Sequence, residues 1–160
     1  MTTVSRLTLL LTGALLLASP AQAREAANLE PDKEVQRDGL DYQADVRAAA
    51  DRETHVADTA LVFTNTGPET LRVVCRAIDG EGRAIGSRAG ASVPAGGLRY
   101  IRASDLSDGE DFVGSAMCKA SGFVIASGVF LAPGAVTDIP VHQRAHRRQS
   151  PMRFPLVATY

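Results

Sequence analysis

The chain starts with an apolar run that differs from everything after it. Residues 7–18 are almost entirely apolar and follow the one early base, Arg6. Residues 19–23 (SPAQA) then end the run with small residues at positions 21 and 23. This order predicts a secretory signal peptide over residues 1–23, cleaved after Ala23. The run is too short to span a bilayer comfortably, and no second run of sufficient length follows.

Two segments of different character come next. Residues 24–38 are polar and contain Pro31, which predicts a flexible leader. From Leu40 to Ala48 apolar and polar residues alternate, which predicts a strand. Leu40, Ala44 and Ala48 also fit one face of a helix, so a helix is the alternative.

Between residues 57 and 141 short apolar segments alternate with turn residues such as Asn65-Thr66-Gly67-Pro68. This pattern predicts short strands, with a single helical turn near residues 104–106 and no long helix. Residues 152–160 are a candidate edge strand, although Pro151 and Pro155 limit its pairing. The expected strands of the middle are residues 57–64, 70–78, 83–87, 98–102, 112–119, 123–131 and 135–141.

These elements predict an all-β protein. About seven or eight antiparallel strands joined by Gly, Pro, Asn and Asp turns favour a two-sheet β-sandwich of immunoglobulin-like architecture. We place that domain at residues 39–141 and a basic tail, which adds little to stability, at residues 142–160. The strands joined by NTG, DGEG and PAGG turns are similar to many exported bacterial sandwich domains.

Charge changes this picture little. The chain has 17 basic and 18 acidic residues, a balance that argues against a dedicated nucleic-acid or anionic-membrane binder. Acids exceed bases in residues 24–58, whereas residues 142–160 carry only bases, so the two ends attract each other or separate partners. The preference for Arg over Lys indicates a G/C-rich, bacterial genome.

The two cysteines, Cys75 and Cys118, are predicted to form a disulfide because an exported chain folds in an oxidising compartment. Cys75 is expected to face the core, and a bridge between strands 43 positions apart suits a staple between the two sheets. Two buried free thiols are the alternative. No CxxC motif is present, so thiol–disulfide catalysis is not expected.

Candidate metal ligands are few. His142 and His146 are four residues apart and would share a helix face, but the glutamate of an HExxH motif is missing and Arg147 and Arg148 repel cations. A second cluster has the carboxylates that calcium prefers but not the spacing of an EF-hand loop. Its members are Asp105, Asp108, Glu110 and Asp111. No cofactor is expected.

Signatures of catalysis are also missing. Residues 90–94 (GASVP) lack the second glycine of a G-x-S-x-G elbow, and no glycine-rich phosphate loop is present. A hydrolase would need a site assembled from distant residues. Four arginines are candidates for a basic face on one sheet: Arg72, Arg76, Arg99 and Arg102.

The sequence therefore favours an exported, periplasmic or secreted, non-enzymatic β-sandwich that acts as a binding or accessory module of the bacterial cell envelope. Its expected partner is an envelope protein or a surface ligand, not a nucleic acid, and the mature chain has no transmembrane segment. A small periplasmic metal-handling protein using His142 and His146, and a hydrolase with a hidden site, are the alternatives.

The signal peptide gives a direct test. N-terminal sequencing of the exported protein is expected to start at Arg24, because signal peptidase cleaves after a small-x-small site. Exported protein that still begins at Met1 would contradict the assigned compartment.

Overall fold

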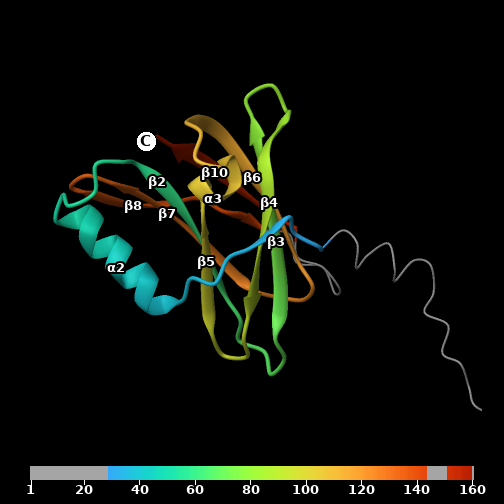
Figure 1. Cartoon of the computed structure of the whole chain (residues 1–160). Helices are drawn as coiled ribbons and strands as arrows, with labels where there is room; N and C mark the ends of the chain where they lie inside the picture. Colours follow the sequence, from blue (N-terminus) through green and yellow to red (C-terminus); the bar gives the residue numbers. More distant parts are fainter. Residues whose placement is uncertain (1–28, 144–150, 160) are drawn as a thin grey trace, which may run out of the picture.

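Two sheets packed face to face form the body of the structure, a computed structural model that describes residues 29–143 and 151–159 (Figure 1). The six-stranded sheet A has the order β1-β4-β3-β6-β10-β9, and the four-stranded sheet B has the order β5-β2-β7-β8. All pairs are antiparallel except β1 with β4. The strands are β1 (Lys33–Glu34), β2 (Asp58–Thr64), β3 (Leu71–Asp79), β4 (Ala84–Val93), β5 (Leu98–Arg102), β6 (Phe112–Ala120), β7 (Ile125–Ala132), β8 (Ala135–Ile139), β9 (His142–Gln143) and β10 (Met152–Ala158). The prediction of a mostly β, two-sheet sandwich is confirmed. The described residues form ten strands rather than the predicted seven or eight, and one pair is parallel.

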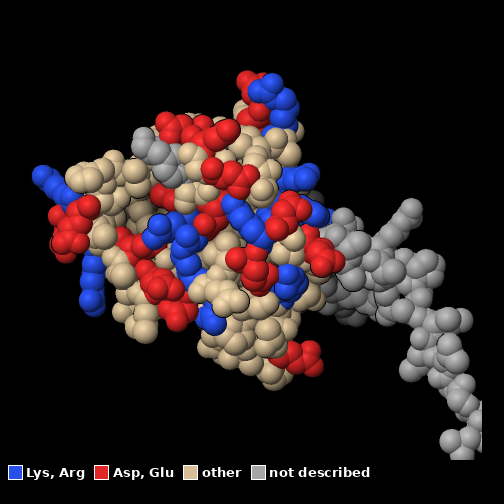
Figure 2. All heavy atoms as spheres, in the orientation of Figure 1, with Lys and Arg blue, Asp and Glu red and all other residues tan. Residues whose placement is uncertain are grey.

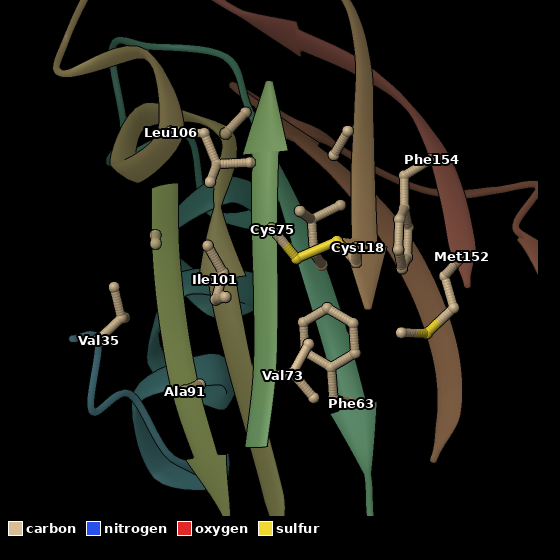
Figure 3. Close-up of a cluster of buried hydrophobic side chains, with 14 of the residues drawn as sticks. Val35, Phe63, Val73, Cys75, Ala91, Ile101, Leu106, Cys118, Met152 and Phe154 are labelled. Atoms are coloured by element: carbon tan, nitrogen blue, oxygen red, sulfur yellow. A yellow bond between two sulfur atoms is a disulfide. The ribbon is translucent and has the colours of Figure 1, made fainter. Parts of the chain in front are cut away.

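The main core lies between the two sheets. Phe63 of β2 and Phe154 of β10 meet edge to face from opposite sheets, with ring centroids 5.8 Å apart (Figure 3). Both rings are fully buried, and an edge-to-face pair adds stabilisation beyond the burial of its area. The short helix α3 (Ala103–Ser107) closes one end of this core with Leu106. It confirms the predicted helical turn.

The disulfide joins Cys75 and Cys118, as predicted, but it lies within sheet A. Cys75 of β3 is directly opposite Cys118 of β6 in an antiparallel pair, and both side chains face the core (Figure 3). The expected staple between the sheets is therefore wrong. Strands distant in sequence are neighbours in a sandwich, so the separation of 43 residues did not distinguish the two arrangements.

Helix α2 (Gly39–Ala50) replaces the strand predicted over Leu40–Ala48. Asp38 caps the helix by accepting hydrogen bonds from the backbone N–H groups of Leu40 and Asp41, while the Asp41 carboxylate accepts from the Asp38 N–H. This reciprocal cap and the alanines favour a helix. Tyr42, Val46 and Ala49 pack on sheet B at helical spacing, whereas Leu40 is 75% exposed.

The structure describes most of the predicted flexible leader, from residue 29 onward. Residues 29–37 cross one edge of sheet A, where Val35 is buried in the core and Lys33–Glu34 forms β1 beside β4. The backbone N–H of Val35 donates to the carbonyl of Gly90 at 2.7 Å. This part of the leader is therefore an edge strand of the sandwich.

The end of the chain also belongs to the sandwich. Strand β10 pairs along its whole length with β6, and β9 adds a short pair on its other side. The Thr59 hydroxyl of β2 donates to the Val157 carbonyl at 2.9 Å and accepts from the Val157 N–H at 3.1 Å, which links the two sheets. The expectation that residues 142–160 add little to stability is revised, because Phe154 and Leu156 are core residues.

Among the described residues, no helix is long and apolar enough to cross a membrane. The predicted signal peptide, residues 1–23, lies outside the described part of the chain.

The disulfide is expected to contribute substantially to stability. Cys75→Ala should lower the free energy of unfolding by about 2–5 kcal/mol, because the cross-link restricts the unfolded chain. Denaturant unfolding of the oxidised protein measures this change, and reduction of the wild type serves as the control. Two free thiols in unreduced protein, found by alkylation and mass spectrometry, would contradict the assignment.

Strand β10 gives a second test of the core. Phe154→Ala should cost about 3–5 kcal/mol, because it leaves a cavity between the sheets. Arg153→Ala changes an exposed neighbour on the opposite side of the same strand and should stay within about 0.5 kcal/mol. If both variants lower the free energy of urea unfolding by an equally small amount, β10 does not belong to the cooperatively folded core.

Candidate binding face on the six-stranded sheet

The outer faces of the two sheets are covered differently. Helix α2 covers the outer face of sheet B and forms a second apolar cluster with it. The outer face of sheet A carries no helix among the described residues, and its only cover there is the edge segment at residues 29–37. Among the described residues, side chains of β3, β6 and β10 on this face are therefore exposed, including Arg76, Met117 and Arg153.

Strand register places a row of exposed side chains across this face. Arg76 of β3 is opposite Met117 of β6, Met117 is opposite Arg153 of β10, and Arg153 is opposite His142 of β9. All four side chains are exposed. Because neighbouring strands lie about 4.8 Å apart, Arg76 and Arg153 flank Met117 at a separation of about 10 Å.

The row borders a shallow depression of about 300 Å³. Lys119, two residues beyond Met117 on the same face of β6, lines it together with Arg76 and Arg88. Met117 is 51% exposed and Val113, further along β6, is 69% exposed. Met and Arg are enriched at protein–protein interfaces, so Met117 between two arginines makes this row a candidate binding surface.

The cations of this face divide into two groups. Arg72 forms an ion pair with Glu34, and Arg88 forms one with Asp32. Arg76, Lys119 and Arg153 form no ion pair among residues 29–143 and 151–159. We call Arg76, Met117, Lys119 and Arg153 the binding face.

The predicted basic face of four arginines is not formed as expected. Arg72 and Arg76 lie on β3 of sheet A, but Arg99 and Arg102 lie on β5 of sheet B. Arg102 is bound to Asp45 of α2. The sequence pattern assigns each of these arginines to the correct strand, but it does not show which strands belong to the same sheet.

The acidic cluster is held by cations of the same chain. Arg37 pairs with Asp105, and Lys33 pairs with Asp108. The Lys33 ammonium and the Ser87 hydroxyl lower the pKa of Asp108. Glu110 and Asp111 are exposed. Within the described residues, no cluster of three or more His, Cys, Asp or Glu side chains has the arrangement of a metal site.

Of the two candidate metal-binding histidines, only His142 lies within the described residues. His142 is exposed on β9 and lines a hollow of about 850 Å³ with Val141 and Gln143. His146 lies outside the described residues. His142 is in a strand rather than a helix, so the helical spacing assumed for a metal pair does not apply to it.

A polar cluster under α2 is the other site-like feature. The Asp45 carboxylate accepts from the Tyr100 hydroxyl at 2.5 Å and from Arg102 Nε at 2.9 Å. Burial and this hydrogen bond raise the pKa of Tyr100. The nearby hollow, lined by Asp45, Asp58 and Arg102, is only about 70 Å³. These groups bind one another, so the cluster holds α2 on sheet B.

Asp58 is buried beside this cluster. It accepts from the backbone N–H groups of Thr59 at 2.7 Å and Ser104 at 3.2 Å. Burial outweighs these bonds and the charge of Arg102, and raises the pKa of Asp58 above its usual 3.8.

Comparisons of the chain with known protein families, with curated proteins and with solved structures found no match.

Sequence reasoning missed Met117, Lys119 and Arg153 as a group. The alternation in residues 112–119 already assigns Phe112, Ala116 and Cys118 to one side of a strand, which leaves Met117 and Lys119 on the other. The missing information was that β10 pairs with β6 and brings Arg153 beside Met117.

Asp58 gives a pH-dependent prediction. Its raised pKa means that the folded state binds a proton more readily than the unfolded state, so its contribution to stability falls as pH rises above 3.8. Asp58→Asn should stabilise the protein at neutral pH, because the amide oxygen still accepts hydrogen bonds without a buried charge. The gain should shrink in acid, where Asp58 is protonated.

Urea unfolding of both proteins across the acid and neutral range measures this difference. Asp138→Asn, at an exposed carboxylate on β8, is the control and should change little. A variant less stable than wild type at neutral pH would show that the ionised carboxylate is favourable in its place.

Proposed function

We propose that the protein is an exported, non-enzymatic binding module of the bacterial cell envelope, and that it binds an anionic partner through the binding face on sheet A. The observation that carries this proposal is the row Arg76–Met117–Arg153 with Lys119 beside it. Three cations that form no ion pair among the described residues surround an exposed thioether. A partner with negative charge satisfies them.

The compartment is part of the same proposal. Residues 1–23 have the order of a signal peptide, and a disulfide such as Cys75–Cys118 persists in oxidising compartments. Both observations support export but are independent of the binding face.

An immunoglobulin-like architecture is proposed on strand order. β2 and β5 pair in one sheet, while β3, β4 and β6 lie together in the other, as strands B, E, C, C′ and F do in such domains. The strand that follows differs, because G lies beside F in such domains but β7 pairs with β2 in sheet B. The disulfide within sheet A is a difference, because the antibody bridge joins the two sheets.

The physics of the face favours recognition over catalysis. Exposed cations steer an anionic partner and select it, while desolvated apolar contact at the centre supplies affinity. Met is adaptable and fits differing apolar side chains. A sandwich whose other face is covered by α2 holds this row rigidly.

Binding of a short Glu-rich peptide, measured by fluorescence anisotropy at about 0.15 M salt, tests the proposal. Arg76→Ala/Lys119→Ala should weaken binding at least about tenfold, because two uncompensated cations are lost. Arg47→Ala/Arg83→Ala removes the same charge at exposed sites on α2 and on the β3–β4 turn, and should have little effect. Equal effects of the two double variants would show attraction by net charge alone and contradict a specific face.

A further inference from the structure

The first described residues form an acidic segment on one edge of sheet A. We call residues 29–37 the strap. Asp32 accepts hydrogen bonds from the side chain and the backbone N–H of Arg88, the latter at 2.8 Å. Glu34 accepts from Arg72 at 2.8 Å and from the Ser92 hydroxyl at 3.3 Å. The strap thus supplies carboxylates to two cations of the outer face.

The strap is extended, and its alternate side chains have different roles. Asp32 and Glu34 point to the outer face, whereas Val35 enters the core and Lys33 pairs with Asp108. Pro31 packs on β4 so closely that a Cβ at Gly90 would lie 2.6 Å from its Cγ. Figure 2 shows the interleaved acidic and basic side chains along the path that this segment takes in Figure 1.

The strap lies beside cations that form no ion pair among the described residues. Arg88, which Asp32 holds, lines the same depression as Arg76, Met117 and Lys119. Arg76 is near enough to lower the pKa of Asp32 further. One end of the outer face is therefore already occupied by an acidic, extended polypeptide, and the same pattern of cations continues beyond it.

We infer that the partner of the binding face is an extended acidic polypeptide with apolar residues between its acids, and that the strap competes with it for the cations of sheet A. This inference rests on the proposed function. The order cation–thioether–cation along Arg76, Met117 and Arg153 is complementary to acid–apolar–acid on one side of an extended chain. Alternate residues of such a chain lie about 7 Å apart and neighbouring strands about 5 Å apart, a difference that long Arg and Glu side chains can span.

Met117 distinguishes a polypeptide from other polyanions. Phosphates of a nucleic acid satisfy the cations but leave Met117 without an apolar contact, and the binding face offers no aromatic ring on which bases stack. An anionic membrane surface satisfies charge without requiring a particular side chain at position 117. A polypeptide uses both the charges and the thioether.

The strap sets the affinity. Its carboxylates lower the positive potential at Arg76 and hold Arg72 and Arg88 away from a partner. Asp32→Asn/Glu34→Gln removes two charges but leaves the backbone bonds of β1 and the burial of Val35 in place. A peptide with repeating Glu-Ser-Val-Ser, which places Glu and Val in turn on one side, should then bind about fivefold more tightly.

The experiment compares this peptide, a single-stranded oligonucleotide and phosphatidylglycerol vesicles on the full chain. Glu53→Gln/Asp138→Asn removes two exposed charges elsewhere and is the matched control, expected to change peptide affinity little. Met117→Ala should weaken peptide binding severalfold and leave oligonucleotide binding unchanged.

The outcomes separate the role of the strap, the class of partner and the proposed function. Peptide binding that depends on Arg76 and Lys119 but is unchanged by Asp32→Asn/Glu34→Gln would overturn the role of the strap and leave the proposed function standing. Oligonucleotide or vesicle binding of equal strength, insensitive to Met117→Ala, would overturn the polypeptide partner. If no anionic probe binds through Arg76 and Lys119, the proposed function itself fails.

Discussion

The pairing of β3 with β6, locked by the Cys75–Cys118 disulfide, is the constraint on which the rest of the structure depends. The two cysteines face the core directly opposite each other, so the next residues on the outer side, Arg76 and Met117, are also opposite each other. A slip of one residue would turn the apolar side of either strand to solvent. One register therefore determines both the core and the candidate binding face.

The outer faces of the two sheets differ in what covers them. Part of the outer face of sheet B is buried, because α2 packs Tyr42, Val46 and Ala49 on it and the bond from Arg102 to Asp45 fixes the helix in place. Sheet A is buried on one side and keeps cations and Met117 exposed on the other. The acidic strap pairs with β4 and reaches Arg72 of β3, and we propose that a further acidic chain binds beside it.

The strands were predictable because alternation and turn residues are local signals, and the bounds of β5, Leu98–Arg102, follow directly from them. Alternation favours a strand over Leu40–Ala48 and leaves the helix as the alternative, because alanine fits both periods. The reciprocal cap of Asp38 and Asp41 is a signal for the helix that the apolar pattern does not contain. The candidate edge strand at residues 152–160 is present as β10, but it lies between β6 and β9. This pairing, on which the binding face depends, is not predictable from local pattern.

An acidic, extended polypeptide that binds across β3, β6 and β10 should perturb the amides of these strands. Chemical-shift mapping of isotope-labelled, oxidised protein with the Glu-Ser-Val-Ser peptide measures this. We expect saturable shifts at residues 74–78, 115–119 and 153, with smaller shifts at residues 32–34 as the strap responds. Shifts confined to α2 and sheet B, or no saturable shifts, would contradict it.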